Sequence, residues 1–379
     1  YLGLFGQVLE YQPQHVEAHA CLAAVAKDDH IAAQRGEEVS SQESPVARAE
    51  RLFRKHGQPA VVAAYFDQEG VLEFDTNPTG AEAILFKYVE DEDGKLRPMF
   101  VCKLGPTPVR AQLPMGSCLV VLKKSGYRPV RYPVFLTRAY DELNSWHGGI
   151  VPLFTEAQIG KGRVYIPPTK FLTGGDPELS RGSSKRAEVK QTPGFLIAQY
   201  PTTVGEYEAF LADVGREAHT PQSTPWKKPG HPVVGVTWEN AIAYCAWRTQ
   251  GDGGTPCRLP TEGEVEVAGG GVDGRRYSWG WCAEAYFATA SDHYKPGEAK
   301  LVEVHECAPQ DQSPYGAYGF AGLVSVLTIT EYPNGVGIRC GRWGMEIKEG
   351  TVRMRGALQK GVATPQHGFR VAWDLPTTT

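Results

Sequence analysis

The sequence lacks any long apolar run. A helix that spans a bilayer needs about 18 or more consecutive, mainly apolar residues, and no stretch of the 379 residues meets that requirement. No charged-then-apolar leader opens the chain either, so nothing in it predicts secretion. We expect no membrane span and a cytoplasmic location. Because the chain begins with Tyr1 instead of Met, we also expect a fragment or a processed product.

The sequence also lacks a large excess of charge of one sign and the cysteine spacing of a metal site. The formal net charge is -4, which provides no bulk field for nucleic acid or an anionic membrane. Eight cysteines contain no CxxC pair and no Cys/His cluster at the spacing of a zinc site. Buried free thiols explain them best. We expect no nucleic-acid partner and no bound cofactor.

Helical periodicity characterises residues 1–55. Leu2, Phe5 and Leu9 share one helical face, Pro13 interrupts the pattern, and a second helix follows. A further helix is predicted from Ser44 to Lys55. The phrase VLEYQPQHVEAHACLAAV resembles the end of a tetratricopeptide-type helical pair.

Period-two alternation replaces the helical pattern in residues 56–140. Turn residues separate five predicted strands, namely Val71–Asp75, Ala83–Val89, Met99–Lys103, Ser117–Leu122 and Tyr132–Leu136. A small antiparallel β-sandwich fits this spacing. The phrases DTNPTGAEAILFKYV and LGPTPVRAQLPMGSCLVVLKKSGYRPVRYPV resemble the PEGA-type accessory domain, which implies a spacer or adaptor. Residues 141–162 are expected to form a linker.

Several motifs follow one another in residues 163–379. They are VYIPPTKFLTGGDPE, GFLIAQYPTTVGEYEAFLADVG, HPVVGVTWENAIAYCAWR, CRLPTEGEVEVAGGGVDGRRYSWG, SPYGAYGFAGLV, TVRMRGA and HGFRVAW. In this order they resemble the formylglycine-generating-enzyme/sulfatase-modifying family. The resemblance implies an α+β fold of the C-type lectin type. Thr203, Thr237 and Thr261 are predicted to begin helices as N-caps.

Cysteines are absent between Gly341 and Phe369. The resemblance implies that the enzymes of the family carry a copper-binding cysteine pair shortly before the final Gly-Phe-Arg. Thiolates are the ligands that Cu(I) prefers, and Cys340 stands alone and too early. We therefore predict a protein that is not an enzyme.

The stretch from Ala321 to Ala372 combines firm turn and framework residues with apolar residues that stand singly in a polar, Gly-rich setting. This mixture, closed by Gly-Phe-Arg, resembles the variable protein of a diversity-generating retroelement, with the variable region at about 322–364. The resemblance implies a hypervariable, solvent-facing surface that recognises a protein ligand. The ligand-binding positions predicted on this basis are Leu323, Ser325, Leu327, Ile329, Val336, Ile338, Gly341, Met345, Ile347, Leu358, Gln359, Lys360 and Val362. At each position a core strand residue is the alternative.

Two other functions stay open. One is a copper- or iron-dependent oxidase of the formylglycine-generating class, whose candidate metal ligands are His231, His293, His305, His367 and Asp292. The other is the sensor or recruitment region of a bacterial Ser/Thr kinase fusion, because a helical segment, a PEGA-like module and a lectin-like domain together resemble such chains. No kinase motif occurs here, so the signalling domain would lie upstream. A structural Ca²⁺ held by Asp292 or by the Ser313–Gly319 loop is a further hypothesis.

Overall fold

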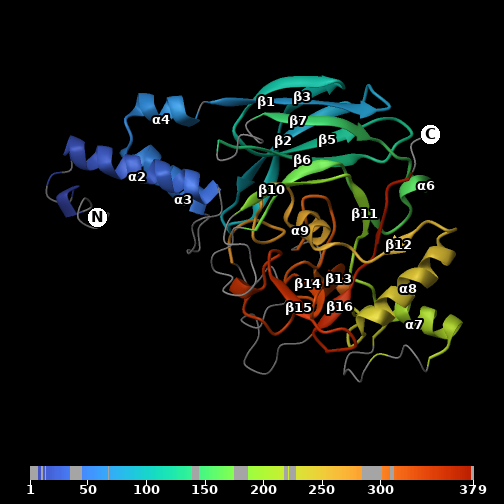
Figure 1. The fold of residues 1–379 in the computed structure, drawn as a ribbon. Helices are drawn as coiled ribbons and strands as arrows, with labels where there is room; N and C mark the ends of the chain where they lie inside the picture. Colours follow the sequence, from blue (N-terminus) through green and yellow to red (C-terminus); the bar gives the residue numbers. More distant parts are fainter. Residues whose placement is uncertain are drawn as a thin grey trace.

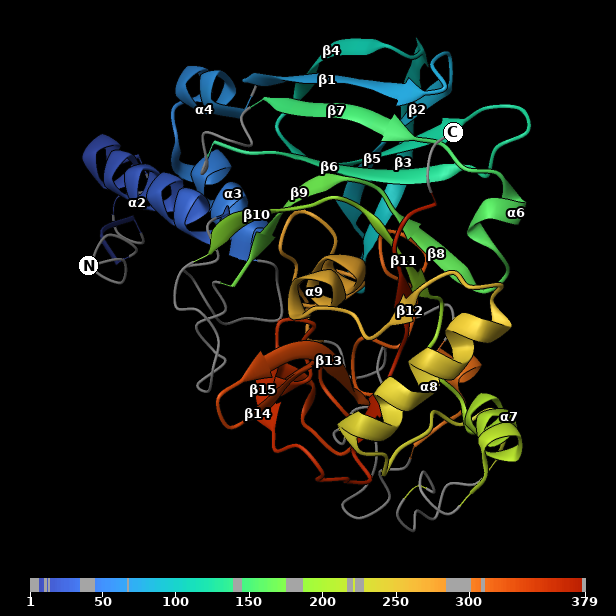
Figure 2. The same ribbon diagram turned by 45° about the vertical axis from the view of Figure 1, so that its right-hand side comes forward.

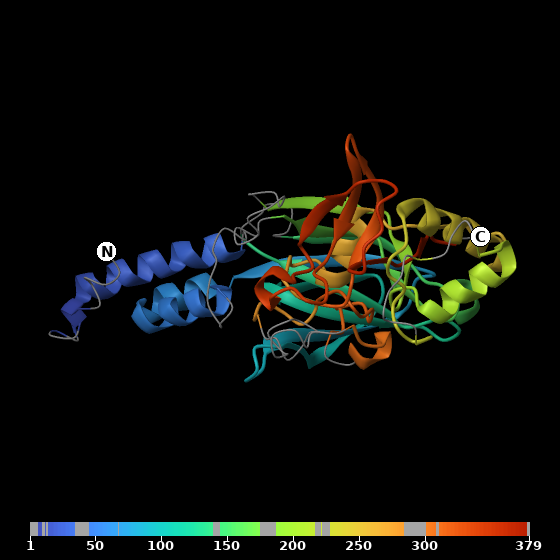
Figure 3. The ribbon, with the colours of Figure 1, turned by 90° about the horizontal axis from the view of Figure 1, so that it is seen from below.

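The computed structural model comprises a helical segment, a β-sandwich and a larger mixed α+β domain (Figure 1). It describes residues 7–9, 12, 14–34, 45–66, 68–138, 145–174, 187–216, 221, 228–283, 301–307 and 311–376. Figure 3 shows the N-terminal helices extending away from the rest of the molecule.

The helical segment contains α2 (Val16–Gln34), α3 (Pro45–His56) and α4 (Pro59–Phe66). The second and third predicted helices are thereby confirmed as α2 and α3, whereas α4 was not predicted. Most of the first predicted helix lies outside the described residues. The three helices share a small apolar cluster of their own, which consists of Ala23, Ala26, Phe53, Val62 and Tyr65.

The β-sandwich has two sheets, β4–β1–β7 and β3–β2–β5–β6. The five predicted strands are confirmed with longer bounds, as β1 (Glu69–Asn77), β2 (Glu82–Glu90), β3 (Leu96–Pro106), β5 (Gly116–Lys123) and β6 (Val130–Leu136). Strand β4 (Val109–Pro114) was missed. Regular alternation of buried and exposed side chains along β1 explains why its sequence was recognisable.

The expected linker, 141–162, contains a strand, β7 (Trp146–Pro152). It pairs in parallel with β1, so the sandwich extends to Pro152 and is not purely antiparallel. The indole of Trp146 is buried and donates to the Tyr132 hydroxyl at 2.9 Å. Two glycines precede a short apolar pair in this strand, which is why the sequence looked like a connection.

The C-terminal domain is built from short strands around one central helix (Figure 2). Its sheets are β12–β17–β11–β8, β10–β9 and β15–β14–β13–β16. The strands are β8 (Arg163–Ile166), β9 (Thr169–Thr173), β10 (Glu188–Thr192), β11 (Phe195–Ala198), β12 (Cys257–Arg258), β13 (Ser325–Tyr332), β14 (Gly335–Arg339), β15 (Arg355–Leu358), β16 (His367–Phe369) and β17 (Ala372–Trp373). Since β11 pairs with both β8 and β17, the two ends of the domain meet in one sheet.

The helices that start at Val204, Trp238 and Glu262 begin where the sequence predicts, whereas a short helix inside the expected linker was not predicted. They are α6 (Glu156–Ile159), α7 (Val204–Val214), α8 (Trp238–Gly251) and α9 (Glu262–Gly270), with 3-10 turns at Val304–Cys307 and Ile347–Glu349. The Thr203, Thr237 and Thr261 hydroxyls each accept from a backbone N–H in the first turn. Thr203 and Thr261 form complete capping boxes with Glu206 and Glu264.

One apolar core runs through the sandwich and the C-terminal domain. It includes Leu72 and Val120 of the sandwich as well as Phe195 and Trp373 of the C-terminal domain. A polar contact also crosses between them, since the Ser117 hydroxyl donates to Asp273 at 2.7 Å. The two parts are therefore packed as one body.

The final Gly-Phe-Arg motif places a guanidinium inside the domain. Arg370 is fully buried and donates to the carbonyls of Ala198 at 3.0 Å, Tyr318 at 2.5 Å and Gly319 at 3.3 Å. Its guanidinium carbon lies 4.1 Å from the Phe320 ring centroid. This one side chain thus joins the end of β11 to the 318–320 segment.

Asp311 holds the other side of the same segment. It is fully buried, and its Oδ2 accepts from the backbone N–H of Phe320 at 2.8 Å and of Ala321 at 3.1 Å. Burial raises the pKa of this carboxyl to about 6, against the lowering effect of Ser278, of the two N–H groups and of Arg370.

None of the helices that the structure describes is both long and apolar enough to cross a membrane.

We expect Asp311 to make stability pH-dependent. A raised folded-state pKa contributes stability that is present below pH 4 and is lost as the pH rises to about 6, a loss of about 3 kcal/mol. The Asp311→Asn variant keeps an oxygen acceptor and cannot ionise. Its free energy of unfolding should therefore rise relative to that of the wild type as the pH rises from 4 to about 6. Urea unfolding of both proteins from pH 4 to pH 7 measures the difference. Parallel stability curves would contradict this assignment.

Candidate ligand-binding face

The C-terminal sheet is anchored to α9 through Glu266. This buried carboxylate pairs with the Arg339 guanidinium, which is itself buried. It also accepts from the Thr173 hydroxyl at 2.7 Å and from the Gly174 N–H at 3.1 Å. Because the buried charges are paired and hydrogen-bonded, β14 is held in one position against α9.

Glu262, one turn earlier on α9, binds the same sheet at its edge. Its two oxygens accept from Arg355 at 3.0 and 2.9 Å, and one of them also accepts from the Tyr332 hydroxyl. The fork-to-carboxylate geometry of this pair is specific in direction as well as strong. Strands β13 and β15 are therefore also bound to α9, through a pair that is more exposed than Glu266–Arg339.

The structure corrects the expectation that the thirteen predicted ligand-binding side chains share one exposed face. Seven are buried, namely Leu323, Ser325, Leu327, Val336, Ile338, Gly341 and Ile347. Ile329, Met345 and Leu358 are half-buried, and only Gln359, Lys360 and Val362 are exposed. For the seven, the alternative of a core position is confirmed.

The burial has a physical cause in the sheet. The first half of β13 and all of β14 are covered on both faces, so Leu327, Val336 and Ile338 belong to the main core. Alternation is lost in such strands. Isolated apolar residues between polar ones looked like surface positions, but the polar neighbours are satisfied internally. The Ser325 hydroxyl, for example, donates to the Cys340 carbonyl at 2.9 Å.

The exposed positions lie together in the connection from β15 to β16. Lys360 pairs with Glu331 at 2.5 Å, and its Nζ lies 4.7 Å from the centroid of the half-exposed Trp238 ring. The next N–H, that of Gly361, donates to Glu239 at 3.2 Å. The connection therefore rests on the first turn of α8.

A second half-exposed tryptophan contacts the same connection. The indole of Trp343 donates to the Pro365 carbonyl at 3.0 Å, and its backbone N–H donates to Leu323 at 3.1 Å. We define the tryptophan face as Trp238, Trp343, Gln359, Lys360 and Val362. Figure 3 shows the red C-terminal strands, whose connections carry four of these residues, projecting from the body of the domain.

Sequence reasoning missed both tryptophans. Trp238 directly follows the helix cap Thr237, so its local pattern indicates a helix start. Trp343 stands in a Gly-rich connection, which indicates no regular element. Both rings pack partly against apolar clusters and are partly exposed, and large aromatic side chains are enriched at binding surfaces. That enrichment could have identified Trp343.

The described candidate metal ligands of the oxidase alternative do not form a group of three. His367 is buried and hydrogen-bonded to Thr364, and burial together with Arg342 lowers its pKa to about 4. His305 is exposed beside Glu303. His231 is buried, while His293 and Asp292 lie outside the described residues. Within the described ranges, no three His, Cys, Asp or Glu side chains are grouped to hold a metal ion.

Cys340 is the cysteine nearest in sequence to the position of the family's pair. It is fully buried, and its backbone has a positive φ of 71°. Burial raises the pKa of its thiol to about 12, so it stays protonated and is a poor nucleophile and ligand. The Ser313–Gly319 loop hydrogen-bonds with itself, Ser313 N–H to Ala317 carbonyl at 2.8 Å. Calcium there stays a prediction.

Comparison with known proteins now supplies the family. The sequence model of the sulfatase-modifying factor enzyme 1-like domain matches residues 153–375, more than half of the chain. The chain belongs to this family. The α+β domain from Leu153 to Leu375 is thus its sulfatase-modifying-factor domain, with the C-type lectin type of fold.

Three relatives illustrate the range of this family. The chain is 30% identical over 177 residues to a formylglycine-generating enzyme of Thermomonospora curvata, covering 34% of this chain and 56% of that protein. It is 28% identical over 224 residues to the mouse inactive C-alpha-formylglycine-generating enzyme 2, covering 45% and 68%. It is 35% identical over 192 residues to the serine/threonine-protein kinase pkn1 of Chlamydia caviae, covering 46% and 27%. The chain thus spans little more than half of the Thermomonospora enzyme.

Two solved structures have a similar fold. PvdO from Pseudomonas aeruginosa aligns with a TM-score of 0.48 at 20% identity, covering 56% of this chain and 94% of that one. Variable protein 1 of Treponema denticola aligns with a TM-score of 0.43 at 19% identity, with the same coverage of 56% and 94%.

Gly341 of the sulfatase-modifying-factor domain should not tolerate a side chain. A Cβ there would lie 2.1 Å from the Gly350 Cα and 2.5 Å from its carbonyl carbon, both backbone atoms. Gly341→Ala should therefore lower the free energy of unfolding by about 3 kcal/mol. Gly251→Ala is the matched control, because nothing lies within 4 Å of a Cβ there. Chemical denaturation compares the two, and equal stability of both variants would contradict the close packing.

Proposed function

We propose that the sulfatase-modifying-factor domain of this chain is a non-enzymatic ligand-binding module whose tryptophan face contacts a protein ligand. One observation carries the first half of the proposal: no cysteine follows Cys340 in the whole sequence. The catalytic cysteine pair that the family resemblance implies before Gly-Phe-Arg is therefore missing. The one nearby thiol is buried and protonated.

The second half rests on how the tryptophan face is built. Its exposed positions lie on the connection between β15 and β16, the two edge strands of one sheet. Two carboxylates of α9 bind that sheet. Connections carried by a rigid scaffold can change side chains without unfolding it. Two half-exposed indoles supply large, rigid contact area, the kind that dominates protein recognition.

The finer proposal is that this chain is the variable protein of a diversity-generating retroelement. The variation would then fall on Gln359, Lys360 and Val362, with Met345 and Leu358 at the margin. The seven buried positions would be framework. The variable set is thus narrower than the sequence suggested, because only Gln359, Lys360 and Val362 of the thirteen are exposed, whereas the half-buried Ile329 and Leu358 pack against the main core.

A two-library experiment tests whether the face can carry variation. Full randomisation of Gln359, Lys360 and Val362 should leave most members folded, because exposed substitutions usually change stability by about 0.5 kcal/mol or less. Randomisation of Leu327, Val336 and Ile338 should leave few, because truncating a buried Leu or Ile costs about 2–5 kcal/mol. Protease resistance of displayed libraries is the measurement. Equal survival of the two libraries would remove the structural basis for a tryptophan-face variable region.

Sequencing the locus in a population with an active retroelement tests the finer proposal. Substitutions should concentrate at codons 358–362 and 345. An even spread across codons 164–321 and 323–362 would refute it. Stoichiometric copper or iron in the purified protein would instead restore the oxidase alternative.

A second candidate function is the recruitment or sensor region of a kinase-linked protein. It is favoured by the 35% identity over 192 residues to the Chlamydia caviae kinase. The aligned region makes up 27% of that kinase. The two proposals are compatible, since recognition at the tryptophan face could be linked to a signalling output. The sequence of the full gene tests it, and a full gene without kinase motifs would rule out a kinase within the same chain.

A further inference from the structure

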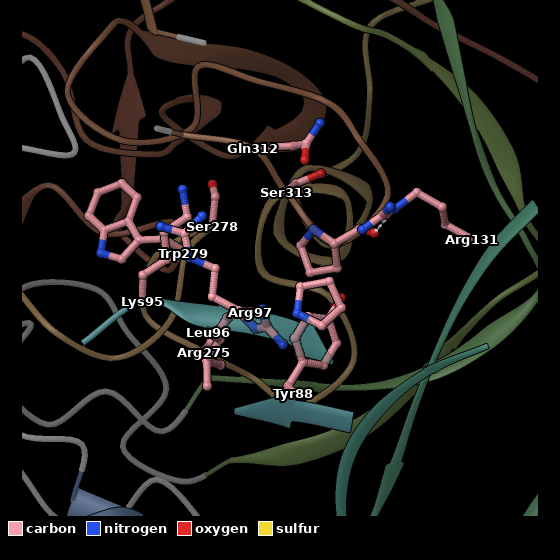
Figure 4. Close-up of a pocket in the computed structure, with 12 residues that line it drawn as sticks. Tyr88, Lys95, Leu96, Arg97, Arg131, Arg275, Ser278, Trp279, Gln312 and Ser313 are labelled. Carbon is pink, nitrogen blue, oxygen red and sulfur yellow. Dashed lines mark hydrogen bonds between the residues drawn. The ribbon is translucent and has the colours of Figure 1, made fainter. Parts of the chain in front are cut away.

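We propose that a cavity between the β-sandwich and the sulfatase-modifying-factor domain binds a small phosphate-bearing anion. The cavity has a volume of about 190 Å³, and both domains line it (Figure 4). It lies away from the tryptophan face and does not depend on the proposed function.

Both domains are needed to form its walls. On one side the backbone N–H of Leu96, at the start of β3, donates to the Trp279 carbonyl at 2.7 Å. On the other side Arg131 of β6 donates through Nε to the Pro314 carbonyl at 2.6 Å. Sites between domains are common locations for small ligands, because the two surfaces leave a concave space.

The lining is strongly cationic. Lys95, Arg97, Arg131 and Arg275 line the cavity, and no acidic side chain is among the residues that do. In Figure 4 the Arg97 and Arg131 side chains reach toward its centre from opposite sides. Four cations around one small space repel one another unless an anion lies between them.

Only part of this charge is balanced by neighbouring acids. Arg275 pairs with Asp273 at 2.7 Å, and both are buried. Arg97 pairs with Asp91 at 2.6 Å at the surface. Within the described part of the chain, Arg131 has no carboxylate within ion-pair distance, and its donation to a carbonyl leaves its charge uncompensated. Burial lowers the pKa of Lys95, Arg97 lowers it further, and Asp91 and Asp311 oppose this lowering.

A buried hydroxyl adds a neutral donor to the cations. Tyr88 is mostly buried, its hydroxyl lies near Arg131, and it has no hydrogen bond of normal geometry among the described residues. The buried Ser278 hydroxyl, in contrast, faces the Asp311 carboxyl, whose pKa it lowers. A buried hydroxyl without a good acceptor is costly, and a ligand oxygen would provide that acceptor.

These features together favour phosphate over other anions. Guanidinium groups match the oxygens of phosphate in a two-pronged geometry, and lysine adds a point charge. A tetrahedral group can accept from donors on several sides at once, as the opposed Arg97 and Arg131 require. The volume is below the range of about 300–1,000 Å³ typical of drug-sized ligands, so the occupant is inorganic phosphate or a small phosphomonoester.

Calorimetric titration of the full chain with inorganic phosphate, and separately with glucose 6-phosphate, tests the proposal at constant ionic strength. The titration should show saturable binding. In thermal unfolding the same ligand should raise the melting temperature, because a ligand that contacts both domains stabilises the docked state. Arg97→Gln and Arg131→Gln should each weaken binding about tenfold or more. Arg110→Gln is the matched control, because Arg110 is an exposed sandwich residue on β4 that does not line the cavity.

Each outcome decides the question. Saturation by both probes assigns a phosphate site, and saturation by the ester alone assigns a phosphomonoester site. No saturation by either, or equal loss of affinity in Arg110→Gln, overturns the proposal, as does binding of only a phosphopeptide or RNA. Arg97 is exposed, so its variant should fold and carry the test even if Arg131→Gln is unstable.

Discussion

Two carboxylates of α9 anchor the C-terminal sheet of this protein. Glu266 and Glu262 of α9 pair with Arg339 and Arg355, which lie on neighbouring strands of the C-terminal sheet. The buried Glu266–Arg339 charges are tolerated only as a pair, whereas the Glu262–Arg355 pair lies at the edge of the sheet with Arg355 partly exposed. The sheet then supplies fixed ends for the connection from β15 to β16.

The position of the tryptophan face follows from that anchoring. The 359–366 connection leaves β15, crosses the first turn of α8 and returns to β16, and it contacts Trp238 and Trp343 on the way. Its exposed side chains can vary because the backbone beneath them is held by other residues. The first half of β13 and all of β14 are unsuitable for variation, since both of their faces are packed.

The packing of the two β-rich domains creates a different kind of site. The turn before β3 and Arg131 of β6 meet the 278–279 and 312–314 segments. Cations from separate sequence regions thereby surround one space. The sandwich contributes Lys95, Arg97 and Arg131, and the C-terminal domain contributes Arg275 and the opposite wall, so the enclosed cavity exists only in the docked arrangement.

Much of the fold could be read from the sequence because its cues are local. The threonine caps of α7, α8 and α9 lie within three residues of their partners, and the strands β1 and β2 show alternating apolar residues. Strand β7 and the burial of Leu327, Val336 and Gly341 could not be read. Burial there depends on distant partners, namely β1, α9 and Gly350. The absence of the cysteine pair was determined by sequence alone, whereas tertiary packing decided which C-terminal side chains reach solvent.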